Sequence, residues 1–267
     1  MKIRDLFFPP KCTACGTLLD MSMFSEPFCE HCMAKWEFAK RAAIDEHHGQ
    51  PTRIFSDKVR DEYGQAVFVL YYEPRHFENI ESKLLFSLKD RGEERSVNFV
   101  ARELLDVIQR NAPFLKDDEA DAVIVWIPRR IGAVRACGFD HMEQVAICLS
   151  KCLSIPAEPV LRRRLFTLEQ KYLTPSARRR NAYTTMKLAK DTSLENKTVI
   201  LIDDIITTGA SLDAAASLLM SAGAKQVIAA VLCAAEHKRT DKYRTENGFN
   251  IIKSRKSKQP PADFKSR

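Results

Sequence analysis

Two adjacent carboxylates, Asp203 and Asp204, stand at a point in the chain where burying a charge would be costly. They follow the aliphatic run 199–202, which is typical of a strand buried on both faces in a parallel sheet. After Gly209, apolar residues recur at helical spacing and predict a helix. Segment 203–211 therefore joins a buried strand to a helix N-terminus, and open α/β sheets bind ligands at such junctions.

The chemistry of this segment points to a phosphorylated sugar. Free backbone N–H groups at a helix start favour a phosphate, and Gly209 lets the backbone approach it closely. Three hydroxyl side chains could donate as well: Thr207, Thr208 and Ser211. Asp203 and Asp204 would repel a phosphate, but they suit the hydroxyls of a ribose, directly or through Mg²⁺. The segment thus predicts a site for ribose 5-phosphate.

The order of these features resembles the motif with which type I phosphoribosyltransferases bind 5-phosphoribosyl 1-pyrophosphate (PRPP). The resemblance implies an α/β fold with a parallel sheet flanked by helices, and a ligand that arrives with Mg²⁺. It assigns Asp203 and Asp204 to catalysis and binding, and it adds the residues that follow to the PRPP site: Thr207, Thr208, Gly209, Ala210 and Ser211. The alternative is an ordinary strand–turn–helix, although two carboxylates after a buried strand are costly without a ligand or partner.

Length and composition allow one α/β domain with a small extra module in 267 residues. The net charge of +7 is uneven, because residues 160–190 hold nine Lys or Arg and the single acid Glu169. Segment 253–267 is basic too. Both segments would attract anions such as nucleotides, pyrophosphate or nucleic acid; a solvated basic face is the alternative.

No apolar run is long enough for a transmembrane helix. The apolar patch 6–8 is cut off by two prolines and is too short for a signal peptide. We therefore expect a cytoplasmic protein without membrane insertion. In that compartment its eight cysteines are metal ligands or free thiols rather than disulfides.

Four of the cysteines form two Cys-x-x-Cys pairs separated by 13 residues: Cys12, Cys15, Cys29 and Cys32. This spacing predicts a zinc ribbon whose four thiolates leave no position open for substrate, so the zinc would be structural. Two redox disulfides are the alternative. We expect the ribbon over residues 1–40, a connector over 41–65, the main domain over 66–236 and a disordered basic tail over 237–267.

The main domain is expected to begin with a strand at 66–72, followed by two amphipathic helices and a second buried strand at 122–127. Arg129 and Arg130 come directly after that strand, and the resemblance implies that this loop holds pyrophosphate. Lys89, at the end of the first helix, could reach an anionic ligand or could simply complement the helix dipole.

The order of motifs from Cys12 to about Val231 resembles the ComF/GntX family. Its members are associated with DNA uptake in natural competence, or with phosphoribosyltransferase-like roles not yet characterised. Where that family usually has Arg-Gly-Phe-Asn-Gln, this chain has Cys137, Asp140 and His141 around Gly-Phe, which puts a transfer of anion contacts to these positions in doubt. His141 could be an acid–base group or a solvent-exposed residue at a helix start.

Residues 160–190 match the same family at several polar positions, among them Arg164, Gln170, Arg178 and Asn181. We interpret the segment as a hood over the PRPP site that shields the reaction from water. The alternative is a long surface loop, although loops of this length without a function are uncommon.

Three functions remain open from the sequence. The chain could transfer phosphoribosyl from PRPP to an acceptor, but no motif for a base or amine pocket is evident. It could sense PRPP without catalysis. It could also act as an adaptor of DNA uptake, with its basic segments binding single-stranded DNA or with competence proteins as partners.

Overall fold

The computed structural model describes residues 9–46, 66–73, 76, 78–116, 121–164, 185–207 and 209–235. Met1–Glu236 form one compact unit, and His237–Arg267 form a second. The predicted tail at 237–267 and most of the predicted connector lie outside the described residues. Among the helices that are described, none is long and apolar enough to span a membrane.

Four parallel strands form the central sheet in the order β1-β6-β5-β2. Both central strands are apolar along most of their length, as expected for a sheet covered on both faces. This arrangement confirms the predicted parallel sheet. The strands are β1 (Ala66–Tyr72), β2 (Ala122–Trp126), β5 (Thr198–Ile206) and β6 (Gln226–Ala235).

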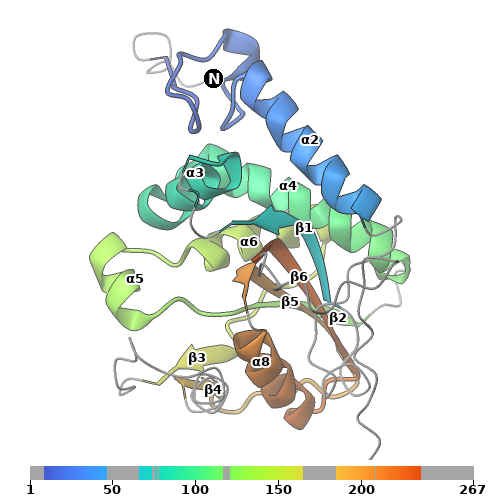
Figure 1. Cartoon of the computed structure of the whole chain (residues 1–267). Helices are drawn as coiled ribbons and strands as arrows, with labels where there is room; N and C mark the ends of the chain where they lie inside the picture. The colour runs from blue at the N-terminus through green and yellow to red at the C-terminus, as the bar shows by residue number, and fades with distance from the viewer. Residues whose placement is uncertain are drawn as a thin grey trace, which may run out of the picture. The chain divides into compact units, whose positions relative to one another are not determined.

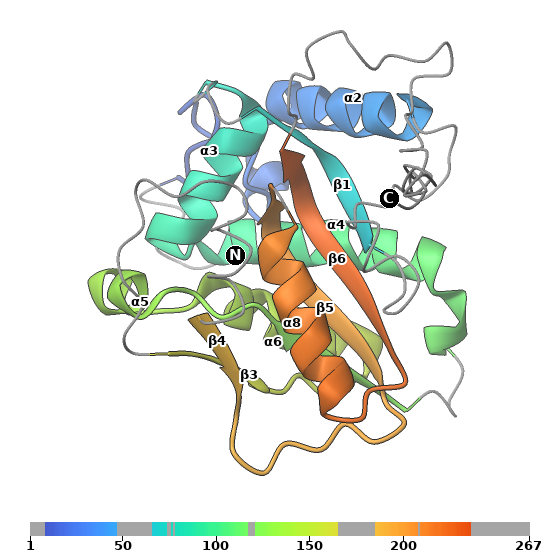
Figure 2. The same cartoon turned by 60° about the horizontal axis from the view of Figure 1, so that its bottom comes forward.

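Helices cover both faces of this sheet, and the strand residues alternate between two apolar clusters. Ile200 and Ile202 pack with the helices of one face, whereas Val199 and Leu201 pack with those of the other. Figures 1 and 2 show α4 and α8 on opposite faces. The helices are α2 (Glu30–Glu46), α3 (Ile80–Phe86), α4 (Glu94–Asn111), α5 (Ile131–Cys137), α6 (His141–Leu153) and α8 (Ala210–Ser221), with short 3₁₀ turns at Met21–Met23 and Pro113–Lys116.

The structure corrects the predicted loop at 203–211. Strand β5 continues through both carboxylates to Ile206, because Ile205 and Ile206 pair with Cys233 and Ala234 of β6. The turn before α8 is therefore much shorter than predicted, and the acid pair lies on the last part of the strand itself. The pairing of Asp203 with Val231 and of Ile205 with Cys233 thus fixes the backbone on both sides of Asp204, which a loop would not do.

Helix α5, two short antiparallel strands and the π-helical form of the turn after α3 had not been predicted. Helix α3 continues into a π-helical turn, η2 (Ser87–Arg91), which ends at Gly92 in a left-handed conformation (φ 57°). Helix α5 fills the segment between Arg130 and α6. Strands β3 (Leu161–Arg163) and β4 (Met186–Leu188) pair antiparallel near the two ends of the predicted hood, inside its bounds.

Helix α2 joins the cysteine segment to the sheet domain. Trp36 is fully buried between Phe28 and Phe99 of α4, with ring centroids 6.0 and 5.2 Å away. The boundary expected at residue 40 falls inside this helix. Lys40 Nζ also lies 3.1 Å from Glu103 Oε2 of α4. The cysteine segment therefore shares its apolar core with the sheet domain.

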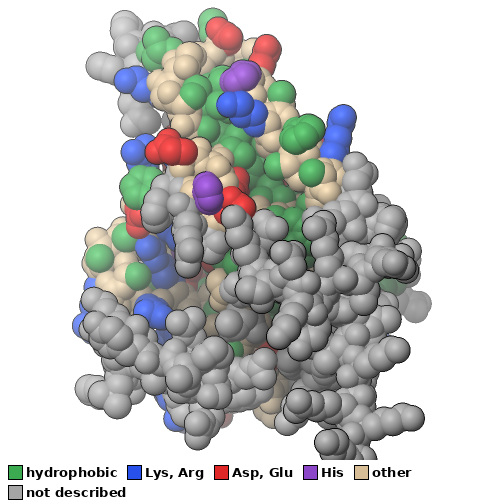
Figure 3. Space-filling view, viewed as in Figure 1, with side chains coloured by type: hydrophobic (Ala, Val, Ile, Leu, Met, Phe, Trp, Pro, Cys, Tyr) green, Lys and Arg blue, Asp and Glu red, His purple; other side chains and the backbone are tan. Residues whose placement is uncertain are grey.

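Apolar side chains remain exposed on the same part of the chain, namely Leu18, Met21 and Phe38. Figure 3 shows apolar and charged side chains interspersed there. Phe38 is 76% exposed, although it lies only two residues from buried Trp36. The two aromatic residues therefore form a matched pair for testing how the helix is held.

We predict that Trp36→Ala lowers the free energy of unfolding by about 3–5 kcal/mol, because it leaves a cavity between the two remaining aromatic side chains, Phe28 and Phe99. Phe38→Ala is the control and should change it by less than ~0.5 kcal/mol. Urea unfolding followed by circular dichroism measures both. The wild type should unfold in one transition, since the core is shared; two separate transitions would contradict this integration.

Candidate functional site

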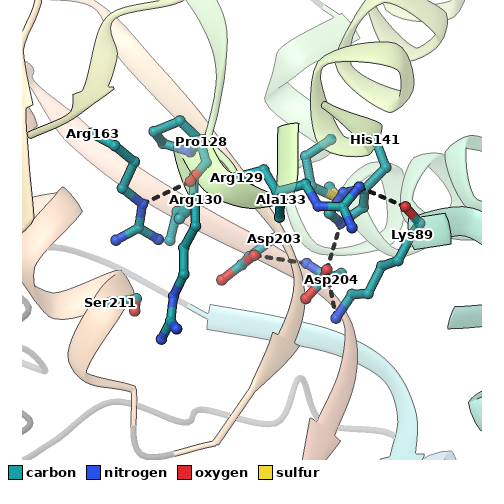
Figure 4. A pocket seen from close by; sticks show the side chains of 12 residues that line it. Lys89, Pro128, Arg129, Arg130, Ala133, His141, Arg163, Asp203, Asp204 and Ser211 are labelled. Carbon is teal, nitrogen blue, oxygen red and sulfur yellow. Dashed lines mark hydrogen bonds and ion pairs between the residues drawn. The ribbon is translucent and has the colours of Figure 1, made fainter. Parts of the chain in front are cut away.

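A cavity of about 310 Å³ opens at the carboxyl ends of β2 and β5. Its lining combines the acid pair with basic side chains and a histidine, contributed by several elements that meet at this edge (Figure 4). The polar residues that line it are Lys89, Arg129, Arg130, His141, Arg163, Asp203, Asp204 and Ser211. This is the edge at which open α/β sheets bind ligands.

Asp204 is buried and held by two donors. Nζ of Lys89 lies 2.9 Å and Nε2 of His141 lies 2.6 Å from the same oxygen, Oδ2. Burial alone would raise the pKa of this carboxyl, but the His141 hydrogen bond and the Lys89 charge outweigh it and lower the pKa to about 2. Asp204 is therefore a fixed, charged acceptor.

Asp203 has the opposite environment. Burial and the neighbouring Asp204 charge raise the pKa of Asp203 to about 8. Its Oδ1 accepts the backbone N–H of Asp204 at 2.9 Å. The charge of Asp203 is thus poorly compensated by the protein, and a cation or a hydroxyl donor would stabilise it.

His141 lies in the interior. The predicted alternative, a solvent-exposed residue at a helix start, is therefore excluded. His141 is 4% exposed and is the first residue of α6. The preceding Asp140 accepts from Met142 N at 3.0 Å as the N-cap of this helix. Its other oxygen accepts from Arg129 N at 2.7 Å. The aspartate that departs from the family pattern therefore ties α6 to the loop after β2, while Cys137 is the partly buried last residue of α5.

The arginines around the cavity play different parts. Arg129 donates from NH1 to the Lys89 carbonyl at 2.6 Å and lies over the Phe139 ring, so it braces η2 against the loop before α6. Arg163 of β3 donates from Nε to the Pro128 carbonyl at 2.8 Å. Burial lowers the pKa of Arg163, yet a guanidinium remains charged. Arg130 is exposed and lines the cavity on the Ser211 side (Figure 4).

The phosphate end of the predicted site lies at the start of α8. Gly209 has φ 76° and immediately precedes the helix, a conformation that a side chain would strain. Ala210 is the buried first residue of α8, Ser211 lines the cavity, and Thr207 is exposed. Thr208 lies outside the described residues.

Of the four hood residues named above, the structure describes Arg164. Gln170, Arg178 and Asn181 lie outside the described residues. Arg164 is exposed just after β3 and is held by its backbone N–H, which donates to the Thr185 carbonyl at 2.9 Å. Arg163, its neighbour, reaches the cavity instead. Sequence reasoning had singled out neither Arg163 nor the direct contact of Lys89 with Asp204.

The four predicted zinc ligands converge. The Sγ atoms of Cys12, Cys15, Cys29 and Cys32 all lie within 4.8 Å of one another. The Thr17 hydroxyl, 3.3 Å from Cys15 Sγ, lowers the pKa of that thiol to about 6, whereas burial raises the pKa of Cys32. Four convergent sulfurs fit a structural zinc ion, which binds thiolates tetrahedrally.

Comparison with known proteins gives one family match, the phosphoribosyl transferase domain, over residues 154–265. This match and the observed strand order support the predicted phosphoribosyltransferase-like fold. A comparison with curated proteins finds no match.

Similar solved structures include a purine phosphoribosyltransferase from Pyrococcus horikoshii Ot3, at 19% identity over 52% of this chain and 72% of that chain (TM-score 0.32). The adenine phosphoribosyltransferase of Saccharomyces cerevisiae is 17% identical over 50% of this chain and 68% of that chain (TM-score 0.32). The glutamine PRPP amidotransferase of B. subtilis is 16% identical over 55% of this chain, with only 30% of the amidotransferase covered (TM-score 0.34).

We predict about one zinc ion per chain in the purified protein. Cys12→Ser should lose the metal and part of the fold, because metal binding supplies folding free energy and Cys12 belongs to the shared core. Cys152→Ser, at an exposed cysteine of α6, should keep both. Elemental analysis and circular dichroism measure the outcome; a metal-free wild type with the same fold would refute the zinc site.

The raised pKa of Asp203 predicts a pH-dependent stability. The unfolded state loses the Asp203 proton near its ordinary value of 3.8, whereas the folded state keeps it until about pH 8. Raising the pH through this window therefore lowers the free energy of unfolding. Asp203→Asn removes the effect, so the stability of the variant relative to wild type should rise by about 2 kcal/mol between pH 5 and 8.5, after allowing for solvent screening.

Urea unfolding without Mg²⁺ at three pH values would measure this change. Asp106→Asn is the control, because Asp106 is exposed on α4 and pairs with Arg110 of the same helix. Its stability difference from wild type should stay constant over the same range. A constant difference for Asp203→Asn as well would show that Asp203 titrates at an ordinary value.

Proposed function

We propose that this chain binds PRPP in the cavity at the carboxyl edge of its sheet, as a phosphoribosyltransferase-like protein. One observation carries the proposal. The acid pair on β5 lies beside the start of α8 and beside several basic side chains, so one cavity offers acceptors for a diol and donors for phosphates.

The acid pair suits the ribose. Lys89 and His141 occupy Oδ2 of Asp204, and the backbone N–H of Asp204 occupies Oδ1 of Asp203. Within the part of the chain that is described, the other oxygen of each carboxylate has no hydrogen-bond partner. Two acceptor oxygens on adjacent residues match two adjacent sugar hydroxyls.

The two ends of the ligand would be held by different elements. The 5-phosphate fits the N-terminus of α8, where Gly209 allows close approach and Ser211 adds a hydroxyl. The pyrophosphate fits exposed Arg130 and the Nη2 group of Arg163, both at the cavity, since Nε and Nη1 of Arg163 already donate within the protein. Both the guanidinium and the backbone N–H of Arg129 are already engaged within the protein, so we assign this residue to bracing rather than to direct contact.

Mg²⁺ fits this site as an ion that arrives with the ligand. The only group of three or more metal-ligating side chains in the described residues is the four-cysteine cluster. The acid pair offers two carboxylates, and Mg²⁺ commonly binds one or two carboxylates together with substrate phosphates and water. It would neutralise the phosphates and the poorly compensated Asp203.

We place the proposed PRPP binding in the cytoplasm, where cysteines stay reduced and can bind zinc.

The proposed reaction is transfer of phosphoribosyl to an acceptor. The bond between the anomeric carbon and the pyrophosphate oxygen breaks, a bond to the acceptor forms, and pyrophosphate leaves with the electron pair. The basic side chains at the pyrophosphate end would stabilise the charge on the leaving group. PRPP sensing uses the same cavity without the transfer step, and the ComF resemblance adds a role in DNA uptake with single-stranded DNA as the ligand.

Calorimetry with PRPP and Mg²⁺ tests the binding site. Replacing Asp203 and Asp204 together by Asn should weaken binding at least tenfold, since each lost charge-assisted hydrogen bond costs roughly 1.5–3 kcal/mol. Asp121→Asn is the matched control, because exposed Asp121 precedes β2 at the opposite end of the sheet's strands and pairs with Lys197. Equal affinity in the double variant and the wild type would refute the site.

Pyrophosphate release from PRPP, measured with a panel of bases, amines and nucleotides, separates the activities. Release with one acceptor supports the transferase. Binding without release across the panel supports a sensor. Salt-sensitive binding of single-stranded DNA that PRPP displaces would support the adaptor instead.

A further inference from the structure

His141 is buried beside the acid pair, and its ring makes a polar contact there as well as filling space. Only 5% of its side chain is exposed, and Nε2 lies 2.6 Å from Oδ2 of Asp204. Its other ring nitrogen, Nδ1, is buried without a hydrogen-bond partner among the described residues. Burying an imidazole with one unsatisfied nitrogen is costly, so its contact with Asp204 must offset that cost.

Three contacts hold Asp204 in place, and the one from His141 is among them. Lys89 reaches Oδ2 from η2, His141 reaches the same oxygen from α6, and the backbone N–H of Asp204 is held by Asp203. Figure 4 shows both contacts, with His141 and the Lys89 amine reaching Asp204 from different directions. With one oxygen doubly bound, the carboxylate cannot rotate freely, and its Oδ1 keeps a single orientation.

The start of α6 is itself anchored. Asp140 bonds both Met142 N and Arg129 N, which ties the residue before His141 to the loop after β2. Gly92, at the end of η2, faces the Phe139 ring so closely that a β-carbon there would lie 2.8 Å from it. The two donors to Asp204 are therefore held by a shared set of contacts.

We propose that His141 is a positioning residue: by donating from Nε2 to Oδ2 of Asp204, it turns Oδ1 toward a ribose hydroxyl of the ligand. The proposal rests on the function proposed above, that the cavity binds PRPP. Lys89 supplies charge on a long flexible side chain, whereas His141 supplies direction because its ring is rigid and enclosed. The ligand class that depends on this device is a phosphorylated ribose with a free diol.

Two substitutions separate donation from packing. Gln places its amide nitrogen near the position of Nε2, so His141→Gln retains a donor for Asp204. Asn is one methylene shorter and places its amide nitrogen near Nδ1, so His141→Asn keeps a polar side chain but removes the donor. The two variants therefore carry the same amide group and differ in which ring nitrogen of His141 the amide nitrogen replaces.

Calorimetry would compare three ligands with both variants and the wild type: PRPP with Mg²⁺, ribose 5-phosphate, and pyrophosphate with Mg²⁺, which lacks the diol. We expect His141→Asn to bind both sugars at least tenfold more weakly than wild type, with pyrophosphate unchanged. His141→Gln should bind all three within about threefold of wild type. Zinc content and thermal unfolding establish that both variants are folded.

Nitrogen-15 spectra of the ligand-free wild type give a second measurement that needs no variant. His141 should carry its hydrogen on Nε2, as donation to Asp204 requires. A ring hydrogen on Nδ1 alone would overturn the proposal even if both variants failed to fold.

The other outcomes are equally decisive. Unchanged sugar affinity in folded His141→Asn would overturn the positioning role and leave the proposed PRPP site intact. A folded His141→Gln that binds as weakly as His141→Asn would overturn it too, as would an equal loss for pyrophosphate. No binding of PRPP to the wild type would refute the PRPP site and, with it, this role of His141.

Discussion

The ion pair between Lys89 and Asp204 compensates a charge that the fold places in a costly position. Two adjacent carboxylates lie at the buried end of β5, and a single cation beside them cannot stabilise both. Lys89 and His141 stabilise Asp204, so the remaining electrostatic strain falls on Asp203. The resulting asymmetry gives the site one preset acceptor and one carboxyl whose charge a cation or a hydroxyl donor would stabilise.

The position of Lys89 depends on an irregular piece of helix. The π-helical turn η2 departs from α-helical geometry at the residues that carry Lys89, and such turns are often found at functional sites. Ser87 of this turn donates to Glu93 Oε2 at 2.8 Å, and the same oxygen lies 3.4 Å from Thr13 Oγ1, inside the first cysteine pair. Arg95 binds Glu93 and the Glu26 carbonyl as well. The cysteine segment thus supports the turn that carries the lysine, and a structural metal there would stabilise more than its own loops.

The cavity is lined by residues from inside and from outside the family match. The family match covers residues 154–265 and so includes β5, α8 and β6. Lys89 and His141 come from outside that range, yet both contact Asp204 within it. The part of the chain outside the family match therefore contributes the two donors that distinguish the two carboxylates.

The sequence alone predicted the parallel α/β class, the acid pair, the helix start after Gly209 and the convergence of the four cysteines. These follow from local patterns, because strand burial, helical periodicity and ligand spacing are all properties of short segments. The predicted end of β5 was too early. Ile205 and Ile206 extend the strand by pairing with β6, and such pairing involves two segments and cannot be predicted from one.

Which groups meet at Asp204 depends on long-range contacts of the folded chain. Lys89 and His141 are far from it along the chain, and the alternatives for each, helix-dipole complement or solvent-exposed helix start, were compatible with their local sequence. Their contacts arise because parallel strands end at one edge and gather η2, α6 and β5 there. Local pattern cannot reveal such a contact, because the free energy of a buried charge depends on partners that only the fold brings together.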